Sequence, residues 1–178
     1  VDAVVFIGGL NKGDHQDSEG ADRLQLGLPY GQDAVIGALA EANPNLAVVF
    51  VSGNAVAMPW IDRVPAVLEA WYSGSEAGNA LADVLFGAVN PSGKLPFTFP
   101  VRLEDCSAHS AGEYPGEGQV VYRDGIFVGY RWIEKERIEP LFAFGHGLSY
   151  TTFDIANVRA DRTSLATTGR LRVSADVT

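Results

Sequence analysis

Two apolar runs rich in β-branched residues, separated by a helix-like segment, constrain the fold of this chain most strongly. They are AVVFIG at residues 3–8 and LAVVFVSG at residues 46–53, and both end in glycine. Continuous apolar runs of this length are typical of parallel strands buried on both faces. The segment LPYGQDAVIGALAEANPN, between them, has proline in its first turn, apolar residues at helical spacing and Asn43-Pro44 at its end. It therefore predicts a helix that connects two parallel strands.

The same alternation continues in the next part of the chain. PAVLEAWY, residues 65–72, predicts a third strand, and SGSEAGNALADVLFG predicts a second helix. Ser73 and Glu76 have the spacing of a capping box at the start of that helix. The order strand, helix, strand, strand, helix predicts an α/β fold, a three-layer sandwich with a mostly parallel sheet between helices.

The composition of the sequence changes after about residue 88. NPSGKLPFTFP (90–100) and SAGEYPGEG (110–118) are rich in proline and glycine and predict loops, whereas GIFVGYRWIE (125–134) predicts a strand with aromatic side chains. LRVSADVT (171–178) alternates apolar and polar residues, as a half-buried strand does. One strand cannot form a core, so residues 154–178 are interpreted as the truncated start of a β-sandwich.

Composition and motifs exclude several functional classes. Hydrophobic residues make up 47% of the chain and the formal net charge is −9, which indicates a globular protein and argues against a nucleic-acid partner. No run approaches the roughly 18 apolar residues of a membrane span. The single cysteine, Cys106, excludes an internal disulfide. Because CxxC, HExxH, GxGxxG and Walker A patterns are all absent, we expect no metal and no cofactor.

An acidic loop, DHQDSEGADR at residues 14–23, follows the first predicted strand. Ligands on open α/β sheets bind at the carboxyl ends of the strands, so the loop is well placed for a site. Three interpretations are open: a solvated surface loop, a divalent metal site, and proton chemistry by Glu19, which a glycine follows. The metal interpretation uses Asp14, His15, Asp17 and Glu19. Their spacing does not match an EF-hand loop.

Two further residues of the acidic loop have an expected structural role. Asp22 and Arg23 carry opposite charges. They are predicted to form an ion pair that anchors the loop without touching substrate.

Six blocks in this order resemble the second domain of glycoside hydrolase family 3: SEGADR, LGLPYGQDAVI, VVFVSGNAVAMPW, AWYSGSEAGNALADVLFGAVNPSGKLPFTFP, GIFVGYRW and PLFAFGHGLSYTTF. The resemblance covers nearly all of residues 1–153, an α/β sandwich domain that is expected to be truncated at its N-terminus. Residues 154–178 resemble the start of the fibronectin type III-like domain that often follows it. The predicted division is therefore 1–153 and 154–178.

The resemblance implies part of a retaining, exo-acting β-glycosidase, most nearly a β-glucosidase that removes terminal non-reducing β-D-glycosyl residues. In many such enzymes the general acid/base is a glutamate in a segment like S-E-G-x-D-R, which here is Glu19. The nucleophile is an aspartate on a TIM-like barrel that is not in this chain. The implied partners are that barrel and an oligosaccharide or an aryl or alkyl β-glycoside as substrate.

Other residues near Glu19 have weaker assignments. His15 and Asp17 are expected to border the leaving-group subsite. Trp60 and Trp71 could stack on sugar rings, but strand-like surroundings favour core packing. A non-catalytic carbohydrate-binding or structural α/β module would have nearly the same sequence and is the alternative function. The sequence leaves the oligomeric state and the compartment open, and the resemblance is compatible with a secreted or periplasmic protein.

Overall fold

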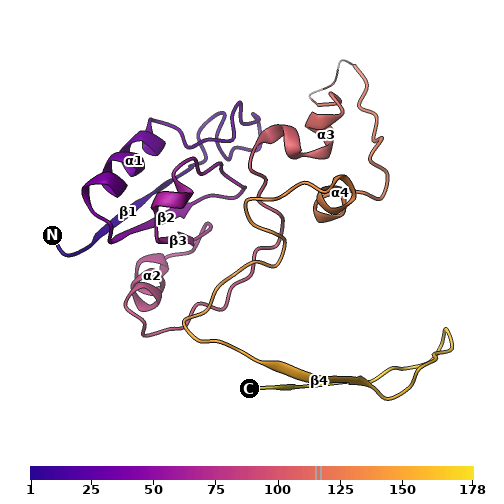
Figure 1. Ribbon diagram of the computed structural model, residues 1–178. Helices are drawn as coiled ribbons and strands as arrows, with labels where there is room; N and C mark the ends of the chain where they lie inside the picture. The colour runs from indigo at the N-terminus through magenta and orange to yellow at the C-terminus, as the bar shows by residue number, and fades with distance from the viewer. Residues whose placement is uncertain (115, 117) are drawn as a thin grey trace.

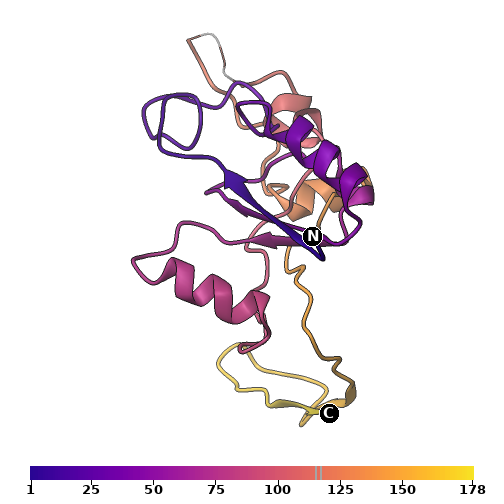
Figure 2. The ribbon, with the colours of Figure 1, turned by 90° about the vertical axis from the view of Figure 1, so that its left-hand side faces the viewer.

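The structure is a computed structural model that describes residues 1–178 except 115 and 117. Its main unit is a three-stranded parallel sheet with β2 at the centre. The strands are β1 (Val4–Gly9), β2 (Leu46–Val51) and β3 (Ala66–Glu69). Helix α1 (Gln32–Ala42) connects β1 to β2, and α2 (Ala77–Leu85) follows β3. The two helices lie on opposite sides of the sheet in Figure 1 and Figure 2, which confirms the predicted α/β fold.

The hydrophobic core lies mainly on the α1 side of the sheet. Alternate residues of β2 face it because side chains alternate along a strand. The buried members are Leu10, Leu28, Ile36, Leu46, Val48, Phe50, Val56, Met58, Trp60, Val64 and Phe99. On the other face of β1, Val5 and Ile7 are 49% and 61% exposed. The segment between β2 and β3, which contains the short 3-10 helix η1 (Ile61–Arg63), thus completes a one-sided core.

Two local predictions for the segment around α2 are wrong. The third strand ends at Glu69, because Trp71 has a φ of 52° and has left the extended region. The predicted capping box does not form either. The Ser73 hydroxyl donates to the carbonyl of Ala70 (3.2 Å), and the Glu76 carboxylate accepts from Asn79 (2.6 Å). Neither side chain therefore caps the start of α2.

The predicted strand at residues 125–134 is also wrong. This segment enters helix α4 (Tyr130–Glu136) through Gly129, whose φ is 58°. A short run of apolar and aromatic residues does not distinguish a strand from a helix by its periodicity. Tertiary contacts resolve the ambiguity, because Ile133 is buried and the Trp132 indole donates to the carbonyl of Asp105 (3.1 Å). That carbonyl belongs to the segment of the short helices η2 (Leu103–Asp105) and α3 (Ser107–Ser110).

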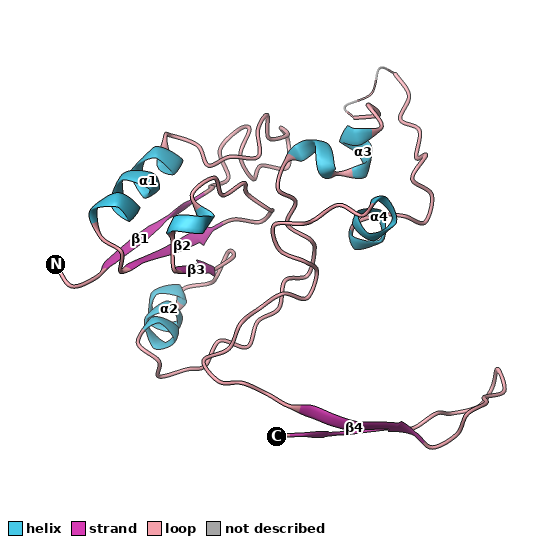
Figure 3. Ribbon diagram, in the orientation of Figure 1, coloured by secondary structure: helices cyan, strands magenta, loops and turns pink. Residues whose placement is uncertain are grey.

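The proline- and glycine-rich loops and the C-terminal segment agree with the sequence. Residues 90–100 run beside 141–146 and are joined to them by an isolated bridge between Phe99 and Phe142. Residues 115 and 117, within the other predicted loop, lie outside the described residues. Strands β4 (Ile155–Ala160) and β5 (Val173–Val177) form an antiparallel pair that extends away from the α/β part (Figure 3). The pair is consistent with the start of a β-sandwich.

In the described residues, no helix is both long enough and apolar enough to cross a membrane.

Candidate active site

The acidic loop leaves the sheet at a point that hydrogen bonds define. The Leu10 N–H donates to the Val51 carbonyl (2.8 Å), which extends the pairing of β1 with β2. Gln32, at the start of α1, accepts from the Gly9 N–H (2.7 Å) and donates to the Gly9 carbonyl (2.9 Å). A Cβ added at Gly9, whose φ is 130°, would lie 2.2 Å from the Val51 carbonyl oxygen, so glycine is required there. The start of α1 therefore holds the carboxyl end of β1 in place.

Asp17 connects the acidic loop to the ends of the neighbouring strands. Its carboxylate accepts hydrogen bonds from the Gly53 N–H (2.6 Å), the Asn54 amide (3.1 Å) and the Tyr72 hydroxyl (2.8 Å). Partial burial alone raises the pKa of Asp17, but these hydrogen bonds and the positive charge of Arg23 outweigh it and lower the pKa. Asp17 is therefore an ionised carboxylate held by donors from the protein.

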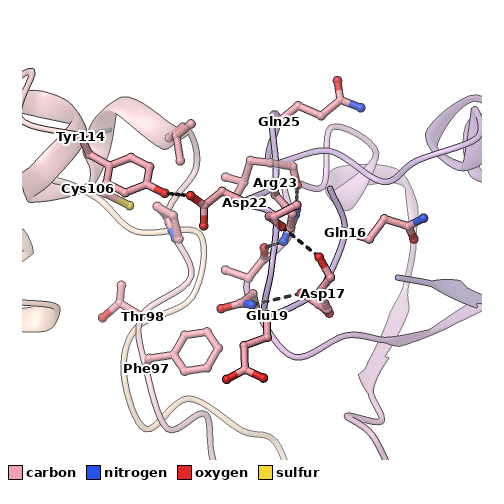
Figure 4. A pocket seen from close by; sticks show the side chains of 17 residues that line it. Gln16, Asp17, Glu19, Asp22, Arg23, Gln25, Phe97, Thr98, Cys106 and Tyr114 are labelled. Carbon is pink, nitrogen blue, oxygen red and sulfur yellow. Dashed lines mark hydrogen bonds between the residues drawn. The ribbon is translucent and has the colours of Figure 1, made fainter. Parts of the chain in front are cut away.

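Arg23 anchors the loop, but not through the predicted ion pair. Its guanidinium donates to the carbonyls of Ala55 (2.8 Å) and Leu26 (2.7 Å). No ion pair joins it to Asp22 in the described part of the chain. Asp22 instead accepts a hydrogen bond from the Tyr114 hydroxyl, contributed by a distant segment (Figure 4). Adjacent charged residues point in different directions here, because each has a better-placed partner elsewhere.

Glu19 lies on a pocket of about 540 Å³ between the acidic loop and the segment that contains Phe97 and Tyr114. Its side chain is exposed, and its carboxylate accepts no hydrogen bond from the described residues. Figure 4 shows it extending away from the Asp17 contacts on the side of Phe97. Asp17 and Asp22 also line the pocket. The structure thus brings three predicted loop carboxylates together and leaves only that of Glu19 without a partner among the described residues.

Other predicted residues are placed differently. His15 does not line the pocket, and its Nδ1 lies 3.0 Å from the Asp22 carbonyl oxygen. Its backbone φ of 61° fits a tight turn in the loop. In the part of the chain that the structure describes, no three His, Cys, Asp or Glu side chains gather as a metal site would require. The role predicted for His15 at the leaving-group subsite therefore stays a prediction.

Sequence reasoning missed the opposite wall of the pocket. Phe97, Thr98 and Tyr114 line it, and they lie far along the chain from Glu19. The Thr98 hydroxyl is buried and has no hydrogen-bond partner among the described residues. Buried polar groups without a partner are uncommon in proteins. No local pattern identifies these residues, because tertiary contacts such as the hydrogen bond from Tyr114 to Asp22 bring them to the loop.

A family model described as the Glycosyl hydrolase family 3 C-terminal domain matches residues 1–150. This chain belongs to glycoside hydrolase family 3. Its relatives include Beta-glucosidase BoGH3A of Bacteroides ovatus, 51% identical over 99% of this chain and 24% of the relative. Thermostable beta-glucosidase B of Acetivibrio thermocellus is 47% identical over 98% of this chain and 23% of the relative. The family 3 chain thus spans about a quarter of the length of the curated relatives it matches.

Solved structures give the same assignment. The family 3 chain is similar to DesR, a β-glucosidase from Streptomyces venezuelae solved in complex with D-glucose. The TM-score is 0.90 and the identity 42%, over 99% of this chain and 22% of that one. A β-glucosidase from Kluyveromyces marxianus, solved in complex with glucose, has a TM-score of 0.85 and 42% identity over 91% of this chain and 19% of that one.

A further carboxyl group of this family 3 domain, that of Glu69, lies at the end of β3. Burial raises its pKa to about 7, although hydrogen bonds from Trp71 and Ser52 oppose this, and the nearby charge of Asp17 adds to it. The Ser52 hydroxyl lies 2.7 Å from the Asn54 carbonyl and 3.0 Å from Glu69 Oε2. One hydroxyl proton cannot serve two acceptors. A protonated Glu69 donates to Ser52, whose own proton then goes to Asn54, so both contacts are satisfied.

Replacing Glu69 with glutamine is expected to change how the stability of the protein depends on pH. The folded state keeps the Glu69 proton to a pKa of about 7, whereas the ordinary value is 4.5. Stability from this group is therefore fully present below pH 4.5 and is lost as the pH rises through about 7. Glu69→Gln mimics the protonated form and removes that loss. The measurement is the unfolding midpoint of both proteins between pH 4.5 and 8.

The comparison of the two proteins isolates Glu69 and its coupling to neighbouring groups such as Asp17, because the more distant titrating groups contribute equally to both. The stability of Glu69→Gln relative to the original protein should rise with pH. A difference that stays constant across this range would show that Glu69 is ionised throughout.

Proposed function

We propose that this chain is part of a retaining, exo-acting β-glucosidase and supplies its general acid/base, Glu19. Membership of family 3 and the β-glucosidase names of its relatives support the activity. One observation carries the assignment of the residue. Of the three carboxylates that line the pocket, those of Asp17 and Asp22 accept hydrogen bonds from protein donors, whereas that of Glu19 accepts none from the described residues.

The chemistry requires a carboxyl group that both gives and takes a proton. In the first step the nucleophile attacks the anomeric carbon, the bond to the leaving oxygen breaks, and Glu19 donates its proton to that oxygen. In the second step ionised Glu19 accepts a proton from water, whose oxygen displaces the nucleophile. A carboxylate that already accepts three internal hydrogen bonds, as Asp17 does, is poorly suited to this exchange.

The complete site needs groups that this chain does not contain. Retaining glycosidases hold the two carboxyl groups roughly 5–5.5 Å apart. We assign the nucleophile to an aspartate on a TIM-like barrel of the same protein, docked over the pocket that Glu19 lines. The substrate is an oligosaccharide, or an aryl or alkyl glycoside, with a terminal β-D-glucosyl group. We also propose the division into an α/β sandwich domain, residues 1–153, and the start of a fibronectin type III-like domain, residues 154–178.

The complete protein is expected to release β-glucose as the first product from the non-reducing end of a β-linked oligosaccharide. This chain made alone should hydrolyse the same substrate at the background rate, because it lacks the nucleophile. Proton NMR of the first product and initial rates at several substrate concentrations measure both. Initial release of α-glucose, or saturable turnover by this chain alone, contradicts the proposal. Saturable binding without hydrolysis by the complete protein supports the alternative of a carbohydrate-binding module.

A further inference from the structure

We propose that Asp17 is the positioning residue of the acid/base loop and does not bind sugar. It holds Glu19 over the pocket by attaching the loop to the ends of β2 and β3. This inference rests on the proposed role of Glu19, and the experiment below separates the failure of one from the failure of the other.

The Asp17 carboxylate accepts three hydrogen bonds from donors of two other segments. Gly53 and Asn54, just after β2, donate at 2.6 and 3.1 Å, and Tyr72, after β3, donates at 2.8 Å. A Cβ added at Gly53 would lie 3.2 Å from the Tyr72 ring and 3.5 Å from Asp17 Oδ2, so these groups are closely packed. A sugar hydroxyl that approached Asp17 would meet a carboxylate on which three of about four acceptor positions are already taken.

Glu19 takes its position from anchors on either side of it. Asp17 is two residues before it, and Arg23, four residues after it, donates to the carbonyls of Ala55 and Leu26. Between the anchors, the Ser18 hydroxyl donates to the Ala21 carbonyl (3.1 Å) and closes the turn. The Glu19 side chain adds no hydrogen bond from the described residues. The loop backbone, which Asp17 and Arg23 hold in place, therefore sets the orientation of the Glu19 side chain.

The charge of Asp17 suits the donors around it. Desolvation and the hydrogen bond to Asp17 raise the pKa of Tyr72 to about 12, so its hydroxyl keeps the proton that it donates. An asparagine at position 17 has one acceptor oxygen for three donors. Its amide group would face an N–H or O–H that also donates. Asp17→Asn therefore weakens the attachment, because it removes the charge and one of the two acceptor oxygens, with almost no change in side-chain volume.

The test compares Asp17→Asn and Tyr72→Phe, singly and together, in the complete enzyme. Unactivated disaccharide and an aryl β-glucoside with an activated leaving group are the two substrates, and kcat/KM is measured for each. A misplaced acid costs about 10²-fold on the disaccharide, since displacements near 1 Å have effects of this order. We expect much less loss on the activated substrate, which needs no proton. The double variant should lose less than the product of the two single losses, because both variants break one contact.

Three results would overturn the inference. Equal losses on both substrates would mean a general loss of folded enzyme, which unfolding midpoints check independently. A raised KM with unchanged kcat on both would mean that Asp17 binds sugar. Unchanged kinetics would mean that Asp17 is dispensable. Glu19→Ala is measured in the same assays. If Glu19→Ala leaves disaccharide hydrolysis intact, the proposed function itself has failed. If Glu19→Ala abolishes disaccharide hydrolysis while Asp17→Asn does not impair it, only the positioning role has failed.

Discussion

Replacing Glu19 with alanine in the complete enzyme is expected to lower kcat/KM for an unactivated disaccharide by about 10²–10⁴-fold, the usual contribution of general acid catalysis. An aryl β-glucoside whose leaving group departs without protonation should keep kcat/KM within a few-fold of the original value. The two substrates share the same sugar and differ in their need for a proton. The ratio of the two effects therefore measures acid catalysis and not binding.

The second step of the reaction, hydrolysis of the glycosyl-enzyme, tests Glu19→Ala independently of the first step. Without a base to activate water, the glycosyl-enzyme intermediate accumulates and limits kcat on the activated substrate. Azide needs no deprotonation, so it should restore kcat and produce β-glucosyl azide. Glu76→Ala is the matched control, because Glu76 is also an exposed glutamate but lies at the start of α2 outside the pocket. Near-normal disaccharide hydrolysis by Glu19→Ala would mean that Glu19 is not the general acid and that the acidic loop is a solvated surface loop.

Replacing Trp60 with alanine should destabilise the α/β domain by about 3–5 kcal/mol, the range for aromatic-to-alanine changes in a core. Trp60 is 1% exposed, and its indole N–H donates to the Asp33 carboxylate (2.8 Å). The change removes the largest fully buried side chain and takes one donor from Asp33. The measurement is the urea midpoint of the complete protein, followed by circular dichroism.

Trp60→Phe separates packing from hydrogen bonding at this position. It keeps an aromatic ring in the core but removes the N–H, while Asp33 still accepts from the Leu28 N–H (3.2 Å). We expect a clearly smaller loss of stability than for alanine. If Trp60→Ala leaves the urea midpoint unchanged but weakens sugar binding, Trp60 belongs to a sugar-stacking surface, contrary to its burial.

The sheet could be predicted from the sequence because its strands are short apolar runs that a helical segment separates, although only β2 is buried on both faces, and one face of β1 is exposed. Strands β1 and β2 are continuous apolar runs, and α1 between them has helical spacing and clear ends. The segment at 125–134 carried no such signature, since aromatic residues pack equally well on a strand or on one face of a helix. Gly129, in the left-handed region, starts helix α4 there, and the contact of Trp132 with Asp105 holds it.

The position of the candidate acid could also be predicted, whereas the roles of its neighbours could not. Glu19 follows a strand at the edge where parallel sheets bind ligands, and this position can be inferred from the neighbouring residues in the sequence. Asp17, Asp22 and Arg23 look alike in the sequence as charged loop residues. Their partners are Tyr72, Tyr114 and the Ala55 carbonyl, each far along the chain.

The sequence alone determined the α/β layering and the place of the acidic loop, because apolar periodicity and strand order follow from neighbouring residues. Only the tertiary structure decided which carboxylate is held and which is not. Hydrogen bonds to the loop come from the ends of β2 and β3 and from the segment around Tyr114, and folding alone brings these together. The hydrogen-bond partners of these carboxylates lie far away in the sequence, so the residues next to a carboxylate do not indicate whether it has a partner.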